Sequence, residues 1–266
     1  MKKVKLDAHR GYSIKYPENT LLAFREALKL DIDMVETDVH MTADGKLVLM
    51  HDHMVDRTTN GTGYVRDKTY DEIRQLDAGG KKDPAFAGER VPLFEDFLEL
   101  MNTRKDIEVC VELKDYPGEI GDRAYESCDK AIAMIEAAGV TDRVYINSWS
   151  GELLQYVDKK YDHKFRLHGY YPRFLLGQTD DSIFDIMYCV CLFNVYLENG
   201  ERKHYEDPVC DQEAFDFIAS KGIEPWVYYS KDNERDLMLA VERGAVAVTS
   251  NDPVAAAAFM RKNGIR

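Results

Sequence analysis

Short apolar runs alternate with amphipathic stretches along most of the chain. The apolar runs predict strands at residues 4–8, 34–39, 107–113, 144–148, 165–169, 187–192, 226–229 and 245–249. The intervening stretches predict helices at residues 19–30, 94–101, 123–138, 152–157, 211–221, 234–243 and 253–262. Alternation of strands and helices is typical of parallel βαβ units, and this number of parallel strands predicts a closed (β/α)8 TIM barrel.

Residues 46–51 break this alternation, because they resemble a strand but follow residues 34–39 after a gap too short for a parallel crossover. The two segments are therefore predicted to form an antiparallel hairpin, with Asp44 and Gly45 in its turn. Folding the chain about that turn places His51 roughly opposite Asp38.

Two local features complete the predicted organisation. Asn19 is expected to cap the helix at residues 19–30. Residues from about 54 to 90 are polar and rich in glycine, with one helical piece at residues 70–76. They predict a short loop insertion after the hairpin, within a single domain that spans residues 1–266.

The composition limits the kinds of partner. The chain has 266 residues, 45% of them hydrophobic, which is enough for one barrel that folds without disulfides. Its 35 basic and 48 acidic residues give a formal charge of −13. Such a balance argues against nucleic acid or an anionic membrane as the main partner, since both attract clustered Lys and Arg. A substrate that carries phosphate would have to be bound by a few local cations.

The cysteines, the N-terminus and the apolar runs bear on disulfides, targeting and membrane insertion. The five cysteines have irregular spacing and no CxxC pair, and Cys189 and Cys191 are expected to be buried strand residues. The N-terminus lacks the apolar stretch of a signal peptide, and no apolar run reaches the length of about 20 residues that a membrane span needs. We therefore expect a cytoplasmic protein without stable membrane insertion.

Candidate chemistry gathers where the predicted strands end, which is where barrel enzymes place their active sites. The polar residues there are His9, Arg10, Glu36, Asp38, Glu112 and Lys114, and the hairpin adds His51 and Asp52. Residues two apart on a strand share one face, so three carboxylates, two histidines and two cations are expected to converge. Carboxylate oxygens suit Ca²⁺ or Mg²⁺, and two histidines can divide acid and base duties. The residues alone thus indicate a metal-assisted hydrolase without naming its substrate.

The same residues lie in motifs that resemble the glycerophosphodiester phosphodiesterase family. The matching segments, in order, are HRG at 9–11, PENT at 17–20, ETDVHMTADG at 36–45, HD at 51–52, DRTTNGTG at 56–63, RVPLFEDFLEL at 90–100 and VELK at 111–114. The resemblance covers roughly the first 115 residues in the family's order and spacing. It implies a (β/α)8 barrel, in agreement with the strand pattern.

The resemblance also implies an activity and a role for each group. Family members use Ca²⁺ or Mg²⁺ and release a glycerol phosphate and an alcohol, so a small glycerophosphodiester is the expected substrate. The implied roles are acid and base for His9 and His51, ligands of the divalent ion for Glu36, Asp38 and Glu112, and phosphate contacts for Arg10 and Lys114.

The second half of the chain is less similar to the family, and it leaves the released alcohol open. Aromatic residues follow or end several predicted strands there, and Trp226 is expected to contact the substrate, with Trp149 as a further candidate. The remaining histidines match no catalytic motif and are expected to be surface or structural residues: His40, His53, His163, His168 and His204.

Two other functions remain open at this point. A phosphatidylinositol-specific phospholipase C or a sphingomyelinase-D-like lipase uses a similar barrel, but would be expected to show an exposed apolar ridge or a basic surface. A catalytically inactive binding barrel would be expected to lack an essential group. Hydrolysis of glycerophosphocholine with and without metal separates the three.

Overall fold

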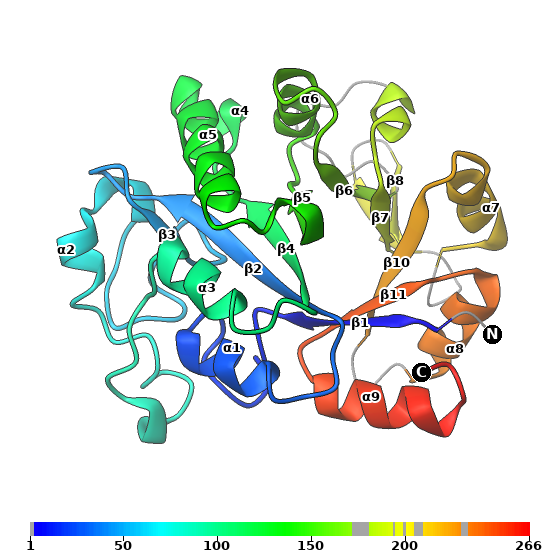
Figure 1. Cartoon of the computed structure of the whole chain (residues 1–266), viewed down its shortest axis with the longest axis horizontal. Helices are drawn as coiled ribbons and strands as arrows, with labels where there is room; N and C mark the ends of the chain where they lie inside the picture. Colours follow the sequence, from blue (N-terminus) through cyan, green and yellow to red (C-terminus); the bar gives the residue numbers. More distant parts are fainter. Residues whose placement is uncertain (1–2, 172–180, 194, 199–200, 205–209, 230–233) are drawn as a thin grey trace.

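The computed structural model describes residues 3–171, 181–193, 195–198, 201–204, 210–229 and 234–266. Eight parallel strands form a closed barrel (Figure 1). Their order around it is β1 (Lys5–His9), β11 (Ala247–Ser250), β10 (Glu224–Tyr229), β7 (Cys189–Leu192), β6 (Arg166–Tyr171), β5 (Val144–Asn147), β4 (Glu108–Leu113) and β2 (Met34–Met41), which pairs with β1. Each strand predicted from the apolar runs is present within two residues of its predicted ends. The (β/α)8 class is confirmed.

Helices surround the barrel and connect most successive strands (Figure 1). They are α1 (Leu21–Ala27), α3 (Phe94–Met101), α4 (Pro117–Ile120), α5 (Asp122–Ala137), α6 (Gly151–Lys160), α7 (Gln212–Ser220), α8 (Glu234–Arg243) and α9 (Pro253–Lys262). Their apolar faces form one core with the outward side of the strands; Phe24 and Phe97, for example, pack with ring centroids 4.7 Å apart. The described part of the connection from β6 to β7 holds only a 3₁₀ turn, η4 (Asp181–Asp185).

The predicted hairpin is present and brings His51 back to the barrel. Strand β3 (Leu47–Leu49) pairs with β2 in antiparallel register, with Val39 opposite Leu49. Beyond that pair, the amide of Met50 donates a hydrogen bond of 3.1 Å to the carbonyl of Asp38. His51 therefore leaves the hairpin beside the end of β2, as the turn at Asp44 and Gly45 predicts.

The segment from 54 to 90 contains η1 (Val65–Asp67), α2 (Tyr70–Ile73) and η2 (Pro84–Phe86). Its apolar side chains join residues of the hairpin in a small cluster that is separate from the main core. The members of this cluster are Val48, Met50, Val55, Val65, Ile73, Ala78 and Val91. The segment therefore packs against the hairpin that precedes it.

A short ribbon and a short helix were not predicted from the sequence. A two-stranded antiparallel ribbon, β8 (Val195–Glu198) and β9 (Glu201–His204), follows β7. The short helix α4 precedes α5 after β4. Both are too short for the apolar periodicity of the chain to mark them.

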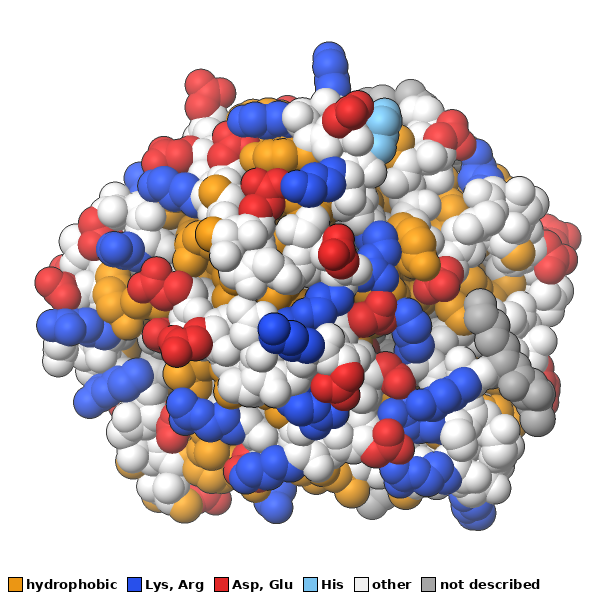
Figure 2. All heavy atoms as spheres, in the orientation of Figure 1, with side chains coloured by type: hydrophobic (Ala, Val, Ile, Leu, Met, Phe, Trp, Pro, Cys, Tyr) orange, Lys and Arg blue, Asp and Glu red, His pale blue; other side chains and the backbone are white. Residues whose placement is uncertain are grey.

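Two observations concern possible partners: the absence of a membrane-spanning helix among the described residues, and the distribution of surface charge. Within the described residues, no helix has the length and apolar character needed to cross a bilayer. On the face shown in Figure 2, acidic and basic side chains are interspersed rather than gathered by sign. Many of the basic side chains are paired with carboxylates, as Arg104 is with Asp106 at 2.8 Å and Lys164 with Glu136 at 2.5 Å.

Candidate active site

Three carboxylates meet at the carboxyl ends of β2 and β4. Glu36 and Asp38 share one face of β2 because they are two residues apart, and this face is the inward one, since Glu36 lines the central pocket. Asp38 lies opposite Glu112 in the register of β2 with β4. One oxygen from each of the three carboxylates lies within 4.8 Å of the other two. All three side chains are buried. The cluster can hold a metal ion.

The electrostatics of this cluster fit a divalent cation. Burial, followed by the negative charge of Asp38, raises the pKa of Glu36 well above its usual value. Burial also tends to raise the pKa of Asp38, but the charges of Lys114 and Arg10 outweigh it and lower that pKa below its usual range. Within the described residues, Glu36 Oε1 and Asp38 Oδ1 make no hydrogen bond, although the ammonium group of Lys114 lies 3.2 Å from Asp38 Oδ1. Buried, mutually repelling oxygens of this kind are the donor set that Ca²⁺ and Mg²⁺ prefer.

His9 lies at the end of β1, and one nitrogen of its imidazole ring is held by a hydrogen bond. Its Nδ1 lies 2.6 Å from the amide oxygen of Asn251, which can only accept, so Nδ1 carries the proton and Nε2 offers a lone pair. Nε2 lies 3.8 Å from a carboxylate oxygen of Glu36. Burial and the charge of Arg10 lower the pKa of His9 to about 3. His9 is therefore neutral at physiological pH and able to accept a proton.

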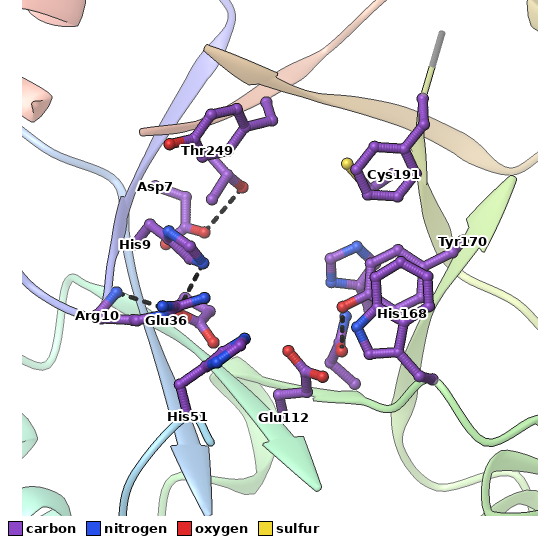
Figure 3. A pocket seen from close by; sticks show the side chains of 14 residues that line it. Asp7, His9, Arg10, Glu36, His51, Glu112, His168, Tyr170, Cys191 and Thr249 are labelled. Atoms are coloured by element: carbon purple, nitrogen blue, oxygen red, sulfur yellow. Dashed lines mark hydrogen bonds and ion pairs between the residues drawn. The ribbon is translucent and has the colours of Figure 1, made fainter. Parts of the chain in front are cut away.

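His51 has a comparable arrangement with a charged partner. Its Nδ1 lies 2.6 Å from Asp52 Oδ1, which leaves Nε2 for the pocket. Burial lowers the pKa of His51, in spite of the nearby charge of Asp38. Two imidazoles with fixed tautomers thus reach one pocket from β1 and from the hairpin (Figure 3).

The two predicted phosphate cations differ in their access to this pocket. Arg10 lines it, donates its backbone amide to Glu36 Oε2 at 3.0 Å, and places Nε 3.3 Å from Asp38 Oδ2. Lys114 is 3% exposed and does not line it. Its Nζ lies 2.6 Å from Glu112 Oε1 and 3.2 Å from Asp38 Oδ1. Lys114 therefore stands among the carboxylates, while Arg10 faces the cavity.

Asn19 supports the carboxylate cluster, although the sequence predicts it to be a helix cap. Helix α1 is capped by Thr20, whose hydroxyl accepts from the amide of Ala23 at 3.2 Å, so the prediction of Asn19 as the cap is wrong by one residue. The side chain of Asn19 points inward instead and donates to Asp38 Oδ2 at 2.7 Å. The family motif PENT marks the position, but spacing along the chain cannot show a contact with Asp38.

A second supporting network adds Arg57 and Glu18, two residues that were not predicted as site residues. Arg57, from the insertion, donates Nε to Asp52 Oδ2 at 2.6 Å and Nη1 to Glu18 Oε2 at 2.8 Å. Glu18 also accepts from Arg10 Nη1 at 3.0 Å. These contacts connect His51 to Arg10 through Asp52, Arg57 and Glu18. The DRTTNGTG segment signals Arg57, but its partners lie in other loops.

The pocket at the centre of this arrangement crosses the barrel from β1 and β2 to β6 and β7 (Figure 3). Five predicted site residues line it, and the other lining residues come from the opposite wall and the floor. The predicted ones are His9, Arg10, Glu36, His51 and Glu112, and the others are Asp7, Asn147, Trp149, His168, Tyr170, Cys191, Phe193, Tyr228 and Thr249. Asp38 lies behind the lining and belongs to the carboxylate cluster.

Trp226 does not occupy its predicted place. It is fully buried below the pocket, where its ring packs on Tyr145 at 5.0 Å and on His168 at 4.7 Å between centroids. Tyr228, two residues further along the inward face of β10, lines the pocket. Trp226 therefore does not reach the pocket as predicted, because it is fully buried one inward-facing position deeper on β10 than Tyr228. The aromatic candidate Trp149 does line the pocket.

His168 also differs from expectation. The sequence suggested a surface or structural residue, whereas the structure places it on the wall of the pocket. His40 is buried against Asp115 at 2.9 Å, and His163 is exposed on the surface, as expected. The side chain of His204 lies outside the described residues.

A (β/α)8 barrel with carboxylates, histidines and cations at the carboxyl ends of its strands has the architecture of a barrel enzyme. The sequence profile of the Glycerophosphoryl diester phosphodiesterase family matches residues 9–255. The chain belongs to this family.

Individual relatives agree with this assignment. A glycerophosphodiester phosphodiesterase of Caldanaerobacter subterraneus subsp. tengcongensis is 43% identical over 160 residues, or 59% of this chain and 62% of that protein. The chain thus matches less than two thirds of that relative's length. A glycerophosphodiester phosphodiesterase of Bacillus subtilis is 31% identical over 92% of this chain and 83% of that protein.

A solved structure shows the same fold at lower identity. A phosphodiesterase from Oleispira antarctica, solved in complex with the product sn-glycerol-3-phosphate, superposes with a TM-score of 0.81 at 20% identity. The match covers 97% of each chain.

Proposed function

We propose that this chain hydrolyses glycerophosphodiesters to a glycerol phosphate and an alcohol, with a divalent ion and with His9 and His51 as the acid and base. One observation carries the proposal: the carboxylate cluster, Arg10 and two imidazoles with fixed tautomers all meet at one pocket. Membership of the family supports the substrate class.

The carboxylates Glu36, Asp38 and Glu112 would hold the ion, which we expect to be Ca²⁺ or Mg²⁺. When bound, the ion supplies positive charge that polarises the phosphodiester. Lys114 contacts two of these carboxylates and offsets part of their repulsion.

The remaining steps belong to side chains that face the pocket. Arg10 presents its guanidinium to the phosphate oxygens, where charge-assisted hydrogen bonds fix the diester. One imidazole accepts a proton at Nε2 from the attacking hydroxyl group. The other enters the reaction as the imidazolium, protonated at both ring nitrogens, and donates its Nε2 proton to the leaving alcohol. Asn251 and Asp52 hold the two Nδ1–H groups, so that both Nε2 atoms stay directed at the substrate.

The alternatives are less well supported. An inactive binding barrel would lack one of the essential groups, yet all of them are present at one site. A phospholipase would prefer an intact lipid to a water-soluble diester, and the substrate comparison below decides this directly.

The test is release of glycerol phosphate from water-soluble glycerophosphodiesters by the purified chain with Ca²⁺ or Mg²⁺. Intact phosphatidylcholine and an alkyl phosphodiester without glycerol serve as comparison substrates. The proposal expects kcat/KM to be highest for the glycerophosphodiesters. Preference for the intact lipid would favour the phospholipase alternative, and no hydrolysis at all would favour the inactive barrel.

A further inference from the structure

Two buried polar groups in the pocket are not used by the proposed chemistry. Asp7 on β1 is 1% exposed and His168 on β6 is 6% exposed, and both line the cavity from opposite sides (Figure 3). Asp7 Oδ2 accepts a hydrogen bond of 3.0 Å from the hydroxyl of Thr249. Across the described chain, however, Asp7 Oδ1 and His168 Nε2 have no hydrogen-bond partner. A ligand group that enters the pocket beside them must form hydrogen bonds with both atoms. Otherwise the two atoms stay buried without a hydrogen-bond partner, which is energetically unfavourable.

The two atoms offer complementary hydrogen-bonding roles. His168 Nδ1 lies 3.4 Å from Cys110 Sγ. Cys110 is buried, and its thiol S–H is a weak donor that can be directed at Nδ1. His168 Nε2 then carries the ring proton and is a donor. Asp7 Oδ1 accepts. A hydroxyl group can both donate and accept a hydrogen bond. The hydroxyl groups of a polyol can therefore bond to His168 Nε2 on one wall and to Asp7 Oδ1 on the other.

The position of the two groups indicates which part of a diester they meet. Asp7 lies two residues before His9 on the inward face of β1, so it is deeper in the barrel than the catalytic imidazole. His168 lies across the cavity from Glu36, on the side of β6 and β7. When the phosphate of a diester lies at Arg10 and the carboxylates, one half of the diester extends toward this floor, and the alcohol half is assigned to it.

An ammonium head group fits these surroundings less well. The ring centroids of Trp149 and Tyr170 are 3.7 Å apart at 11°, and Phe193 stacks with Trp149 at 5.7 Å and 20°. Stacked rings turn their faces to each other, whereas a cage for a quaternary ammonium turns several faces to one centre. Arg10 adds positive charge to the same cavity.

An alkyl alcohol fits less well for another reason. It would leave both Asp7 Oδ1 and His168 Nε2 without partners, and a site built for hydroxyl groups rejects analogues that lack them.

We propose that Asp7 and His168 bind hydroxyl groups of the alcohol half of the substrate, so that the chain prefers glycerophosphodiesters whose alcohol is itself a polyol. This inference rests on the proposed hydrolysis and goes beyond it by naming the class of alcohol released.

The sharpest test compares glycerophosphoglycerol with glycerophosphopropanol, two diesters of equal chain length that differ only in the hydroxyl groups of the alcohol. We expect the wild type to favour the polyol by about tenfold or more in kcat/KM. Glycerophosphocholine, measured alongside, tests the ammonium alternative.

Variants assign the preference to the two residues. His168→Phe and Asp7→Leu remove the polar atoms at nearly constant volume and should bring the ratio of the two substrates close to one, mainly through KM for the polyol. Asp7→Asn keeps an acceptor oxygen and should retain most of the preference. Cys191→Ala changes the same cavity wall without removing either polar atom, so it should alter both substrates alike. Thermal unfolding identifies variants that do not fold; if Asp7→Leu is one, His168→Phe decides.

The outcomes separate the inference from the proposed function. If the wild type cleaves neither diester, nor the choline diester, the proposed hydrolysis itself fails. If it cleaves the polyol and the alkyl diester equally well, or if His168→Phe keeps the preference, the hydrolysis stands and the polyol inference is overturned. A preference for glycerophosphocholine that Asp7→Leu abolishes also overturns it, in favour of an ammonium site.

Discussion

Asn19 Nδ2 donates a hydrogen bond of 2.7 Å to Asp38 Oδ2, and this contact joins the loop after β1 to the carboxylate cluster on β2. The amide oxygen of Asn19 accepts in turn from the hydroxyl of Thr37 at 3.0 Å. Asn19 has a φ of +55°, a left-handed conformation that asparagine tolerates better than most residues. Its backbone is thus bent to deliver the amide to Asp38, which fixes the orientation of that carboxylate.

We predict that Asn19→Ala weakens binding of the divalent ion by about 10- to 100-fold, the usual effect of losing a group that orients a metal ligand. The measurement is the ion concentration that gives half-maximal activity, together with direct titration of the ion. Asn19→Asp is the matched control, because it keeps the shape but sets a negative charge against Asp38. Asn19→Asp should change the affinity for the divalent ion by a different amount from Asn19→Ala. Equal ion affinity in Asn19→Ala and the wild type would contradict the role of Asn19.

Removal of the ion should abolish hydrolysis and leave the fold intact. The three carboxylates lie at strand ends of a barrel with a continuous apolar core, so the barrel does not depend on the ion for folding. Chelation followed by dialysis should stop release of glycerol phosphate, and Ca²⁺ or Mg²⁺ should restore it. Circular dichroism should stay unchanged throughout. Full activity after exhaustive chelation would refute a metal-dependent mechanism.

His9→Ala and His51→Ala should each lower kcat by about 10² to 10⁴, the range expected for a positioned proton-transfer group. Titration with the ion should show nearly unchanged affinity, since neither imidazole belongs to the carboxylate cluster. His163→Ala is a suitable control, because the side chain of His163 is exposed and its Nδ1 lies 2.8 Å from Asp158, away from the pocket. Wild-type turnover in His51→Ala would show that the hairpin does not serve the reaction.

Arg57→Gln should disturb His51 through Asp52. Burial tends to raise the pKa of Asp52, but hydrogen bonds from Arg57 and His51 outweigh it and lower that pKa to about 2. A depressed carboxyl pKa stabilises the fold above the unfolded value near 3.8 and loses this effect as the pH falls toward 2. Arg57→Gln should therefore destabilise the protein most at neutral pH, and the difference from the wild type should shrink between pH 4 and pH 2.

Denaturant unfolding across that pH range checks the prediction, and kcat should fall by about tenfold as His51 loses its support. Arg57→Lys is the control: it keeps the charge but not the planar fork that spans Asp52 and Glu18. A difference from the wild type that is independent of pH would contradict the coupling to Asp52.

The contribution of Asp7 to stability should depend on pH in the opposite sense to that of Asp52. Burial raises the pKa of Asp7 from 3.8 to about 7, in spite of the hydrogen bond from Thr249. A raised carboxyl pKa costs stability as the pH rises from the unfolded value to the folded one, here by roughly 4 kcal/mol at most. Asp7→Asn, which is always neutral, should be more stable than the wild type at pH 8 and nearly equal to it at pH 4. Denaturant unfolding at the two pH values measures the difference, and equal gains at both would show that Asp7 does not titrate between them.

The sequence alone determined the fold and most of the carboxylate site. Apolar runs of strand length, separated by amphipathic stretches, leave few architectures other than a parallel barrel, and all eight strands lie where those runs predict them. Glu36 and Asp38 share a face because side chains alternate along a strand, and this local rule holds in any fold. The Asp44-Gly45 turn fixed the return of His51, because a hairpin of that length leaves little choice of register.

Only the tertiary structure decided the depth of each inward side chain and the partners of the loops. Alternation shows that Trp226 and Tyr228 both point inward, but their level depends on pairing with Ala247 and Thr249 of β11, a strand from another part of the chain. His168 reaches the pocket, and Asn19 reaches Asp38, through contacts between segments that are distant in sequence. Such contacts arise from the shear and closure of the whole barrel, which no local pattern of hydrophobic and polar residues encodes.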